Sequence, residues 1–166
     1  TIILIYILSI LSYIIPKLIV VVSKSSKKNC VHLGYHKRKL KLINSGFDLS
    51  LFKINNSKKL NFKRKFKIKK TIPLIGIVAR YHPIKDHENL INALSIIKSK
   101  NIDFFCIMVG SNMSIKNRFL VKQIKKLKLD GFVKLCGPKN NISEIMNGMD
   151  INILCSKSEG FPSVIV

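Results

Sequence analysis

The chain of 166 residues has no tryptophan, only four arginines, only eight acidic residues and no Cys-x-x-Cys motif. The shortage of arginine and the absence of tryptophan argue against a dedicated nucleic-acid-binding domain, which usually gathers arginine and aromatic side chains on one face. The wide spacing of the four cysteines argues against a metal site or a disulfide framework. We expect free, buried thiols in a reducing cytoplasm. These residues are Cys30, Cys106, Cys136 and Cys155.

Lysine and isoleucine are abundant. The chain holds 27 isoleucines, 26 lysines and 14 asparagines, and its net charge is +22. Codons for these three residue types are rich in A and T, so we attribute much of the charge to a nucleotide bias of the source genome. Such a charge would otherwise suggest a polyanion-binding protein. The apolar share of 47% is large enough to exclude a wholly disordered chain.

The charge is unevenly distributed. The net charge is +1 over residues 1–22, +15 over residues 23–70 and +6 over residues 71–166. Half of the eighteen positions from 53 to 70 are basic, a pattern typical of a solvated connector. We therefore expect an exposed linker or hairpin there, and a surface that binds polyphosphate or anionic lipid is the alternative.

The first segment, Ile2–Ile15, is almost entirely apolar and ends at Pro16. It is shorter than the roughly 20 residues that span a bilayer. A buried or membrane-facing helix is therefore favoured over a transmembrane span. Three short elements are expected to follow: a strand at Leu18–Val22, a helix at Ser25–Leu33 and a strand at Leu40–Ile43.

From Ile72 onward, apolar runs alternate with amphipathic segments. Strands are expected at Pro73–Ala79, Asp103–Val109, Phe132–Cys136 and Asp150–Cys155. Helices are expected at Asp86–Lys98, capped by Asp86, at Ser114–Lys128, with Phe119, Ile124 and Leu127 on its apolar face, and at Ile142–Asn147. This order predicts an open parallel sheet whose ligands bind beyond the carboxyl ends of the strands. The loops of interest are 80–86, 110–113, 137–141 and 156–163.

The first of these loops carries Arg80 and Lys85 at a turn between strand and helix. A guanidinium can bond two phosphate oxygens at once, and an ammonium adds a mobile charge beside it. The loop is therefore predicted to hold a diphosphate, and two ordinary surface cations are the alternative. His82 is expected either to donate to a phosphate or to serve the turn. The other histidines, His32, His36 and His87, are expected at the surface.

The last loop also follows an expected strand. Glu159 is its acidic residue, Gly160 permits close approach of the backbone, and Pro162 is suited to begin a helix. A carboxylate placed there can accept hydrogen bonds from sugar hydroxyls while cations hold the phosphates. A solvated loop acid is the alternative.

Two stretches in these loops resemble a known family. They are Val78–His87 and, about seventy residues later, Ser156–Ser163, and the upstream segments Val22-Ser23 and Leu42–Asp48 with Phe52 fit the same pattern. Together they resemble the retaining glycosyltransferase family 4, also called group 1. The resemblance implies an α/β architecture of the GT-B type, a Rossmann-like parallel sheet with flanking helices.

The same resemblance implies a division of the chain. Residues 1–52 would be the tail of the N-terminal, acceptor-side domain, residues 53–71 a basic interdomain linker, and residues 72–166 the nucleotide-sugar-binding domain. Since the second acid of the family's Glu-x7-Glu motif would fall just beyond Val166, we expect a truncated fragment that is inactive alone.

Residue roles follow from the resemblance as well. Arg80 and Lys85 would contact the donor diphosphate, and Glu159 would lie close to the transferred sugar, so these three are the expected catalytic residues. Further donor-binding residues would be Gly137, Pro138, Asn141, Gly160, Phe161, Ser163 and Val164. No metal or other cofactor is expected, in line with the missing Asp-x-Asp motif.

The expected function is retaining transfer of a sugar from a nucleotide-sugar donor to a saccharide or lipid-linked acceptor, in envelope or capsule polysaccharide synthesis. The expected location is the cytoplasm, with peripheral contact at the cytoplasmic face of the inner membrane, and no nucleic acid is expected as a partner. Two alternatives are a non-catalytic truncated remnant of such an enzyme and a polyanion-binding basic protein.

Overall fold

The structure, a computed structural model, describes residues 2–53 and 55–164 and contains two compact units. The first unit consists of residues 2–47 and 159–164, and the second of residues 48–53 and 55–158. The three-part domain division inferred from the family resemblance stays a prediction.

The first unit is a small α/β assembly. Its elements are α1 (Ile2–Leu11), β1 (Ile19–Val21), α2 (Lys24–His32), the 3-10 turn η1 (Lys37–Lys39) and β2 (Leu40–Leu42). The strands pair in parallel, with Ile19 opposite Leu40. Helix α2 begins where the Ser23 hydroxyl accepts a hydrogen bond from the amide of Ser26, at 3.0 Å. The expected helices and strands of this region are thus present.

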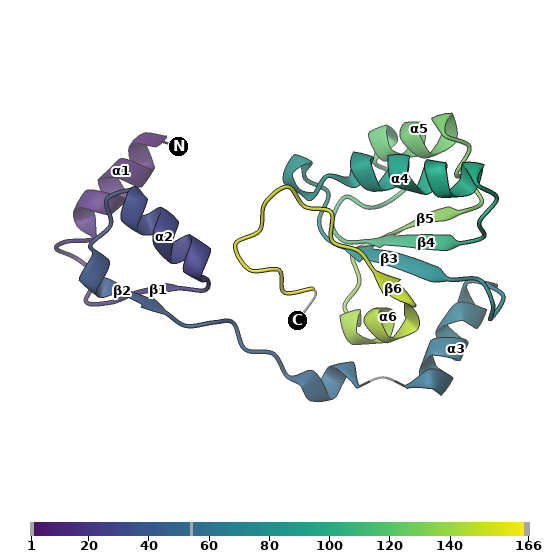
Figure 1. Cartoon of the computed structure of the whole chain (residues 1–166), viewed down its shortest axis with the longest axis horizontal. Helices are drawn as coiled ribbons and strands as arrows, with labels where there is room; N and C mark the ends of the chain where they lie inside the picture. Colours follow the sequence, from purple (N-terminus) through teal and green to yellow (C-terminus); the bar gives the residue numbers. More distant parts are fainter. Residues whose placement is uncertain (1, 54, 165–166) are drawn as a thin grey trace. The chain divides into compact units, whose positions relative to one another are not determined.

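The second unit is built on a parallel sheet with the strand order β5-β4-β3-β6 (Figure 1). Its strands are β3 (Leu74–Val78), β4 (Phe105–Val109), β5 (Val133–Gly137) and β6 (Ile151–Asn152). Its helices and 3-10 turns are η2 (Leu49–Phe52), α3 (Asn56–Lys65), η3 (Pro83–Lys85), α4 (His87–Ser99), α5 (Arg118–Lys126) and α6 (Ile142–Gly148). All four predicted strands form, although β6 is shorter than the apolar run Asp150–Cys155.

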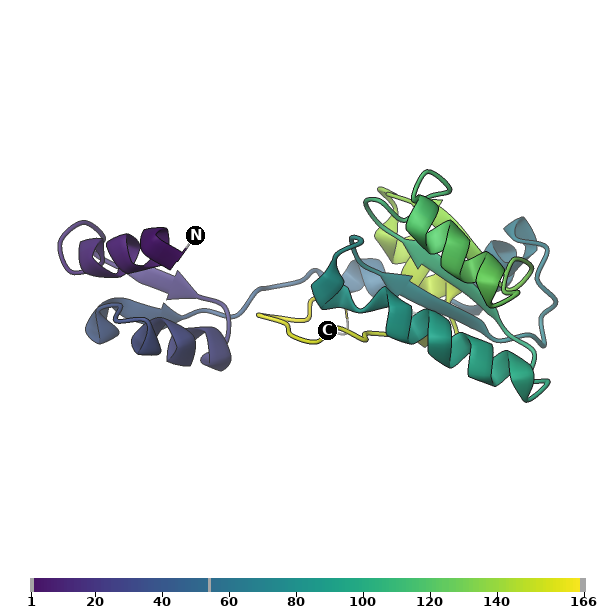
Figure 2. The same ribbon diagram turned by 90° about the horizontal axis from the view of Figure 1, so that it is seen from above.

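Helices cover both faces of this sheet. Figures 1 and 2 show α4 and α5 on one face and α3 and α6 on the other. Leu94 of α4 and Leu120 of α5 pack on the side chains of β3 and β4 that point to their face. Phe62 of α3 and Ile145 of α6 pack on Ile107 from the opposite side. The near-continuous apolar strands are therefore buried on both faces, as in other doubly covered parallel sheets.

The segment expected to be an exposed linker or hairpin is instead helix α3. Asn55 begins it by accepting a hydrogen bond from the amide of Lys58 at 2.9 Å. Phe62 enters the core, and Lys63 is also buried because its ammonium reaches Asp150 at 2.6 Å. Among its many lysines the segment holds two buried apolar side chains, Phe62 and Ile68, and one buried ion pair, so the expectation was wrong.

Four further expectations differ from the structure. Asp86 lies at the start of α4 but makes no capping hydrogen bond, because its backbone is left-handed, with φ of 51°. On α5, Phe119 is exposed and Leu120 is buried instead. His87 is buried rather than at the surface. The cysteines are free, but only Cys106 is fully buried.

The apolar segment at the start of the chain forms α1, and most of its apolar side chains are exposed. Within residues 2–53 and 55–164, no helix has the length and apolar character needed to cross a membrane.

Candidate functional site

The loops that follow β3, β4 and β5 are joined side by side beyond the strand ends. The amide of Tyr81 donates to the carbonyl of Ser111 at 2.8 Å, and the amide of Gly110 donates to the carbonyl of Gly137 at 2.9 Å. Gly110 has φ of +144°, and a Cβ atom there would come within 2.0 Å of the Ala79 carbonyl oxygen. Only glycine allows this close approach of two loops. The predicted ligand-binding edge of the sheet is therefore a continuous backbone platform.

A hollow of about 670 Å³ opens on this platform. Tyr81 and Pro138 supply flat apolar surface, while Lys116 and Arg118 supply positive charge. The other lining residues are Ser111, Asn112, Ser114 and Asn117. Such a combination suits a nucleotide, since a ring can stack on a base and cations can bind phosphate oxygens.

Of the predicted binding residues, Pro138 is one that lines this hollow, directly after Gly137 at the end of β5. Sequence reasoning selected the loop at 110–113 but missed Lys116 and Arg118, which lie just beyond it. The available signal was their position, Lys116 just before α5 and Arg118 at its first residue, but two cations among thirty do not stand out.

Arg80 and Lys85 lie on the turn that leads from β3 into α4. His82 holds this turn, because its Nδ1 atom accepts a hydrogen bond from the amide of Ile84 at 3.2 Å. Arg80 is exposed and Lys85 is half-buried. The histidine thus serves the local backbone in this structure.

The loop after β6 is fastened to the same turn. The amide of Lys157 donates to the carbonyl of Ile84 at 2.8 Å, and the Cys155 thiol lies 3.1 Å from the carbonyl oxygen of Lys85. The Lys157 ammonium lies 3.7 Å from the Asp86 carboxylate. Two loops that are seventy residues apart in sequence therefore form one structure around Lys85.

Behind this turn, His87 packs against Tyr81, with 5.5 Å between ring centroids. Burial, and secondarily the charge of Lys85, lowers the pKa of His87 to about 4. Burial also raises the pKa of Tyr81, and the Glu88 carboxylate adds to that effect. Both rings are therefore uncharged at neutral pH, so positive charge at this edge comes from arginine and lysine.

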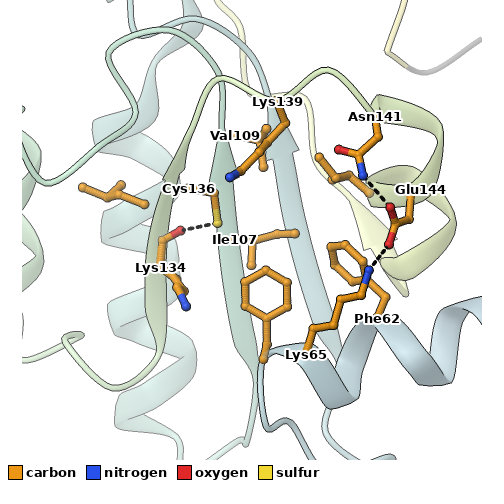
Figure 3. Close-up of a pocket in the computed structure, with 12 residues that line it drawn as sticks. Phe62, Lys65, Ile107, Val109, Lys134, Cys136, Lys139, Asn141 and Glu144 are labelled. Carbon is orange, nitrogen blue, oxygen red and sulfur yellow. Dashed lines mark hydrogen bonds and ion pairs between the residues drawn. The ribbon is translucent and has the colours of Figure 1, made fainter.

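Asn141 lies at a different hollow, of about 410 Å³, between the sheet, α3 and α6 (Figure 3). Its amide donates to the carboxylate of Glu144, which also pairs with Lys65. Hydrogen bonding from Lys65 lowers the pKa of Glu144. The structure thus places Asn141 among residues that connect α3 to α6, apart from the lining of the hollow at Pro138.

The remaining predicted residues, Glu159, Gly160, Phe161, Ser163 and Val164, belong to the first unit. The Phe161 ring stacks on Phe47, with 6.0 Å between centroids and an angle of 12° between planes. The amide of Ser163 donates to the carbonyl of Phe161 at 2.9 Å. The predicted donor site consequently comprises two groups of residues, one in each unit, and their joint role stays a prediction.

Comparison with known proteins identifies the family. The family described as glycosyl transferases group 1 matches residues 58–166. EpsF of Bacillus subtilis (strain 168), named as a glycosyltransferase, is 27% identical over 130 residues, which are 78% of this chain and 33% of EpsF. Anabaena HepE in complex with UDP and glucose has a TM-score of 0.89 at 24% identity, over 99% of this chain and 45% of HepE. WaaG, a glycosyltransferase involved in lipopolysaccharide biosynthesis, has a TM-score of 0.73 at 17% identity, over 88% of this chain and 40% of WaaG.

The likeness to HepE confirms the predicted α/β fold of the GT-B type. The chain spans about a third of the length of EpsF and under half of that of HepE. Since the family match covers more than half of its residues, the chain belongs to the group 1 glycosyl transferases.

Proposed function

We propose that the protein is a retaining glycosyltransferase of family 4 that moves a sugar from a nucleotide-sugar donor to a saccharide or lipid-linked acceptor. It acts in envelope or capsule polysaccharide synthesis, in the cytoplasm at the inner face of the membrane. The described residues hold no group of three His, Cys, Asp or Glu side chains that could bind a metal. The proposal assigns neutralisation of the charge on the departing diphosphate to the cations Arg80 and Lys85.

The arrangement around Lys85 supports this proposal most strongly. Arg80 and Lys85 lie on a turn that is held at both sides, by the His82 cap and by the loop that carries Lys157. Preorganised cations at a strand–helix turn stabilise negative charge that develops on a departing diphosphate. HepE, which shares the fold, was solved with UDP and with UDP-glucose. A nucleoside diphosphate is the leaving group that these cations suit.

The hollow at the end of the sheet adds a place for the rest of the nucleotide. Tyr81 and Pro138 would contact the base, and Lys116 and Arg118 would contact phosphate or ribose oxygens. Glu159, with Gly160 and Phe161, would reach the transferred sugar, as the family resemblance implies. The name of WaaG, which refers to lipopolysaccharide biosynthesis, supports an envelope glycan as the acceptor.

The polyanion-binding alternative is weakened by helix α3. Lys59 and Lys63 pair with Asp150, and Lys65 pairs with Glu144. One third of the nine cations that suggested a binding surface are thus engaged in structural ion pairs. The alternative of a non-catalytic remnant is decided by turnover of the complete protein.

The test is glycosyl transfer by the complete protein with UDP-glucose as the first donor probe. Arg80→Ala and Lys85→Ala should each lower kcat by ~10²–10³ with the fold intact, the usual loss for one preorganised stabilising group. Arg64→Ala and Lys122→Ala, at exposed positions on α3 and α5, are matched controls and should retain activity. Turnover within about threefold of the parent for both site variants would refute the assignment.

A further inference from the structure

The turn that carries Lys85 ends in an uncommon backbone conformation. Asp86, which joins η3 to α4, has φ of 51° and ψ of 46°, in the left-handed region that a residue with a Cβ atom rarely adopts. Its carboxylate makes no capping hydrogen bond to α4. Such a conformation persists only where the surrounding structure holds it. The contacts that hold Asp86 therefore also fix the backbone of its neighbour, Lys85.

The loop after β6 passes the start of α4 (Figure 1), and the thiol of Cys155 in this loop contacts the turn. The sulfur lies 3.1 Å from the carbonyl oxygen of Lys85 and 3.4 Å from that of Asp86. The backbone amide of Leu90, in the first turn of α4, hydrogen-bonds to the same thiol. Burial, and secondarily the charge of Asp86, raises the pKa of the Cys155 thiol. The thiol is therefore protonated at neutral pH and can donate to these carbonyl groups.

The same loop makes two further contacts with the turn, and they differ in strength. The amide of Lys157 donates to the carbonyl of Ile84 at 2.8 Å, so the loop contacts three consecutive carbonyl groups of the turn. The ion pair between Lys157 and Asp86 is long, at 3.7 Å, and the Lys157 side chain is 64% exposed, so it adds little. Cys155, by contrast, packs against the apolar core that includes Leu90. Among these side chains, the thiol is therefore the one that ties the turn to the core.

We propose that Cys155 is a positioning residue for Lys85: its thiol holds the carbonyl groups of Lys85 and Asp86, and thereby sets the Lys85 ammonium for the diphosphate of the donor. The thiol acts through Lys85 and not on the substrate. This inference rests on the proposed function, because that reaction gives Lys85 its task. A cation stabilises a departing diphosphate most strongly when it is already in place, since no ordering is then needed during the reaction.

The first experiment is a double-mutant cycle on glycosyl transfer by the complete protein, with UDP-glucose as the donor probe. Cys155→Val keeps the apolar volume but removes the hydrogen-bond donor. It should lower kcat about tenfold in the parent, and by less than about twofold in a Lys85→Ala background. A loss of folded protein would lower kcat by the same factor in both backgrounds. Equal losses in the two backgrounds would therefore overturn the proposal.

Two further variants separate the thiol hydrogen bond from packing. Cys155→Ser keeps a donor at this position and should stay within about threefold of the parent in kcat. Cys136 provides the matched control, because its thiol is also half-buried and lies 3.7 Å from a backbone carbonyl oxygen, that of Lys134 on β5. Cys136→Val should leave kcat unchanged in both backgrounds. A serine variant as impaired as the valine variant would contradict a role for the hydrogen bond.

Amide hydrogen exchange of the complete protein, measured without ligand, reports on the turn independently of turnover. The amides of Lys85 and Asp86 donate within the turn, at 2.9 Å and 3.2 Å, to the carbonyls of His82 and Pro83. Cys155→Val should raise their exchange rate at least about threefold, and Cys136→Val should not. If valine prevents folding, Cys155→Ala takes its place in both experiments.

Exchange at the turn as slow as in the parent would overturn the proposal, whatever the transfer assay gives. A parent protein that transfers no sugar would instead refute the proposed function, while the exchange rates still decide whether the thiol holds the turn. The two failures are therefore distinguishable.

Discussion

The carboxylate of Asp150 connects three parts of the second unit, and its removal makes a quantitative prediction. Its two oxygens lie 2.7 Å from the ammonium of Lys59 and 2.6 Å from that of Lys63, both on α3. The amide of Leu74, at the start of β3, donates to it at 2.7 Å. The Lys63 ammonium also donates to the carbonyl of Ile72 at 2.8 Å. Asp150→Asn would therefore leave a buried ammonium without its counterion.

The magnitude follows from the pKa of this carboxyl group. Burial alone would raise the pKa of Asp150, but the hydrogen bond from Leu74 and the two lysines outweigh it and lower the pKa from 3.8 to about 2. At about 1.4 kcal/mol for each pKa unit, this difference corresponds to about 2 kcal/mol of folding free energy. Because the folded pKa is the lower one, this stability is fully present above pH 3.8 and is lost as the pH falls toward 2.

The assay is urea unfolding of the 166-residue chain, followed by far-UV circular dichroism between pH 7 and pH 2. Asp150→Asn should lower the free energy of unfolding by about 2 kcal/mol at pH 7, and the gap from the parent should shrink to about 1 kcal/mol at pH 3. Asp130→Asn, at an exposed position, is the control and should stay within about 0.5 kcal/mol. A gap that is the same at every pH, or no gap at pH 7, would refute the ion-pair account.

Two further predictions concern residues near the carboxyl ends of the strands of the second unit. His87 is buried and has no hydrogen-bond partner among the described residues. Its pKa is lowered from the ordinary value of 6.5 to about 4 in the folded chain. Between these two pH values, therefore, the imidazole gains a proton only in the unfolded chain. Stability should fall by about 3 kcal/mol over that range on acidification, and His87→Phe, but not His32→Phe, should remove this dependence in the same unfolding assay. Gly110→Ala should lower the melting temperature by several degrees, because its Cβ would meet the Ala79 carbonyl, whereas Gly131→Ala, with open space around it, should leave it unchanged.

The strands of the second unit could be predicted because their signal is local. A continuous apolar run bounded by glycine or proline indicates a buried parallel strand, and β3 and β4 lie within two residues of the predicted limits. Arg80 and Lys85 were selected because loops at the carboxyl ends of such strands face the ligand, and their role in donor binding stays a prediction.

Helix α3 and the role of Asp150 could not be predicted in the same way. The contact between Lys63 and Asp150 joins residues 87 positions apart, and no local pattern marks either as a partner of the other. Its residue propensities and its charge predicted a solvated connector. The position of α3 is instead determined by Phe62, which packs closely against Gly148. A Cβ atom on Gly148 would lie 2.2 Å from the Phe62 ring. Tertiary packing overrides a weak local signal in such segments.

Compositional bias alone does not explain the exposed isoleucines of α1. If a surplus of isoleucine simply spread over the surface, the helices of the second unit would show the same excess. There the apolar residues are mostly internal: Ile91 and Ile124 are buried in α4 and α5, and the exposed positions are mostly polar, with Ile96 and Phe119 as large apolar exceptions. In α1 the order is reversed, with serine inside and isoleucine outside. Because both patterns occur in one chain, the surroundings of each helix, and not the codon bias of the gene, account for the difference.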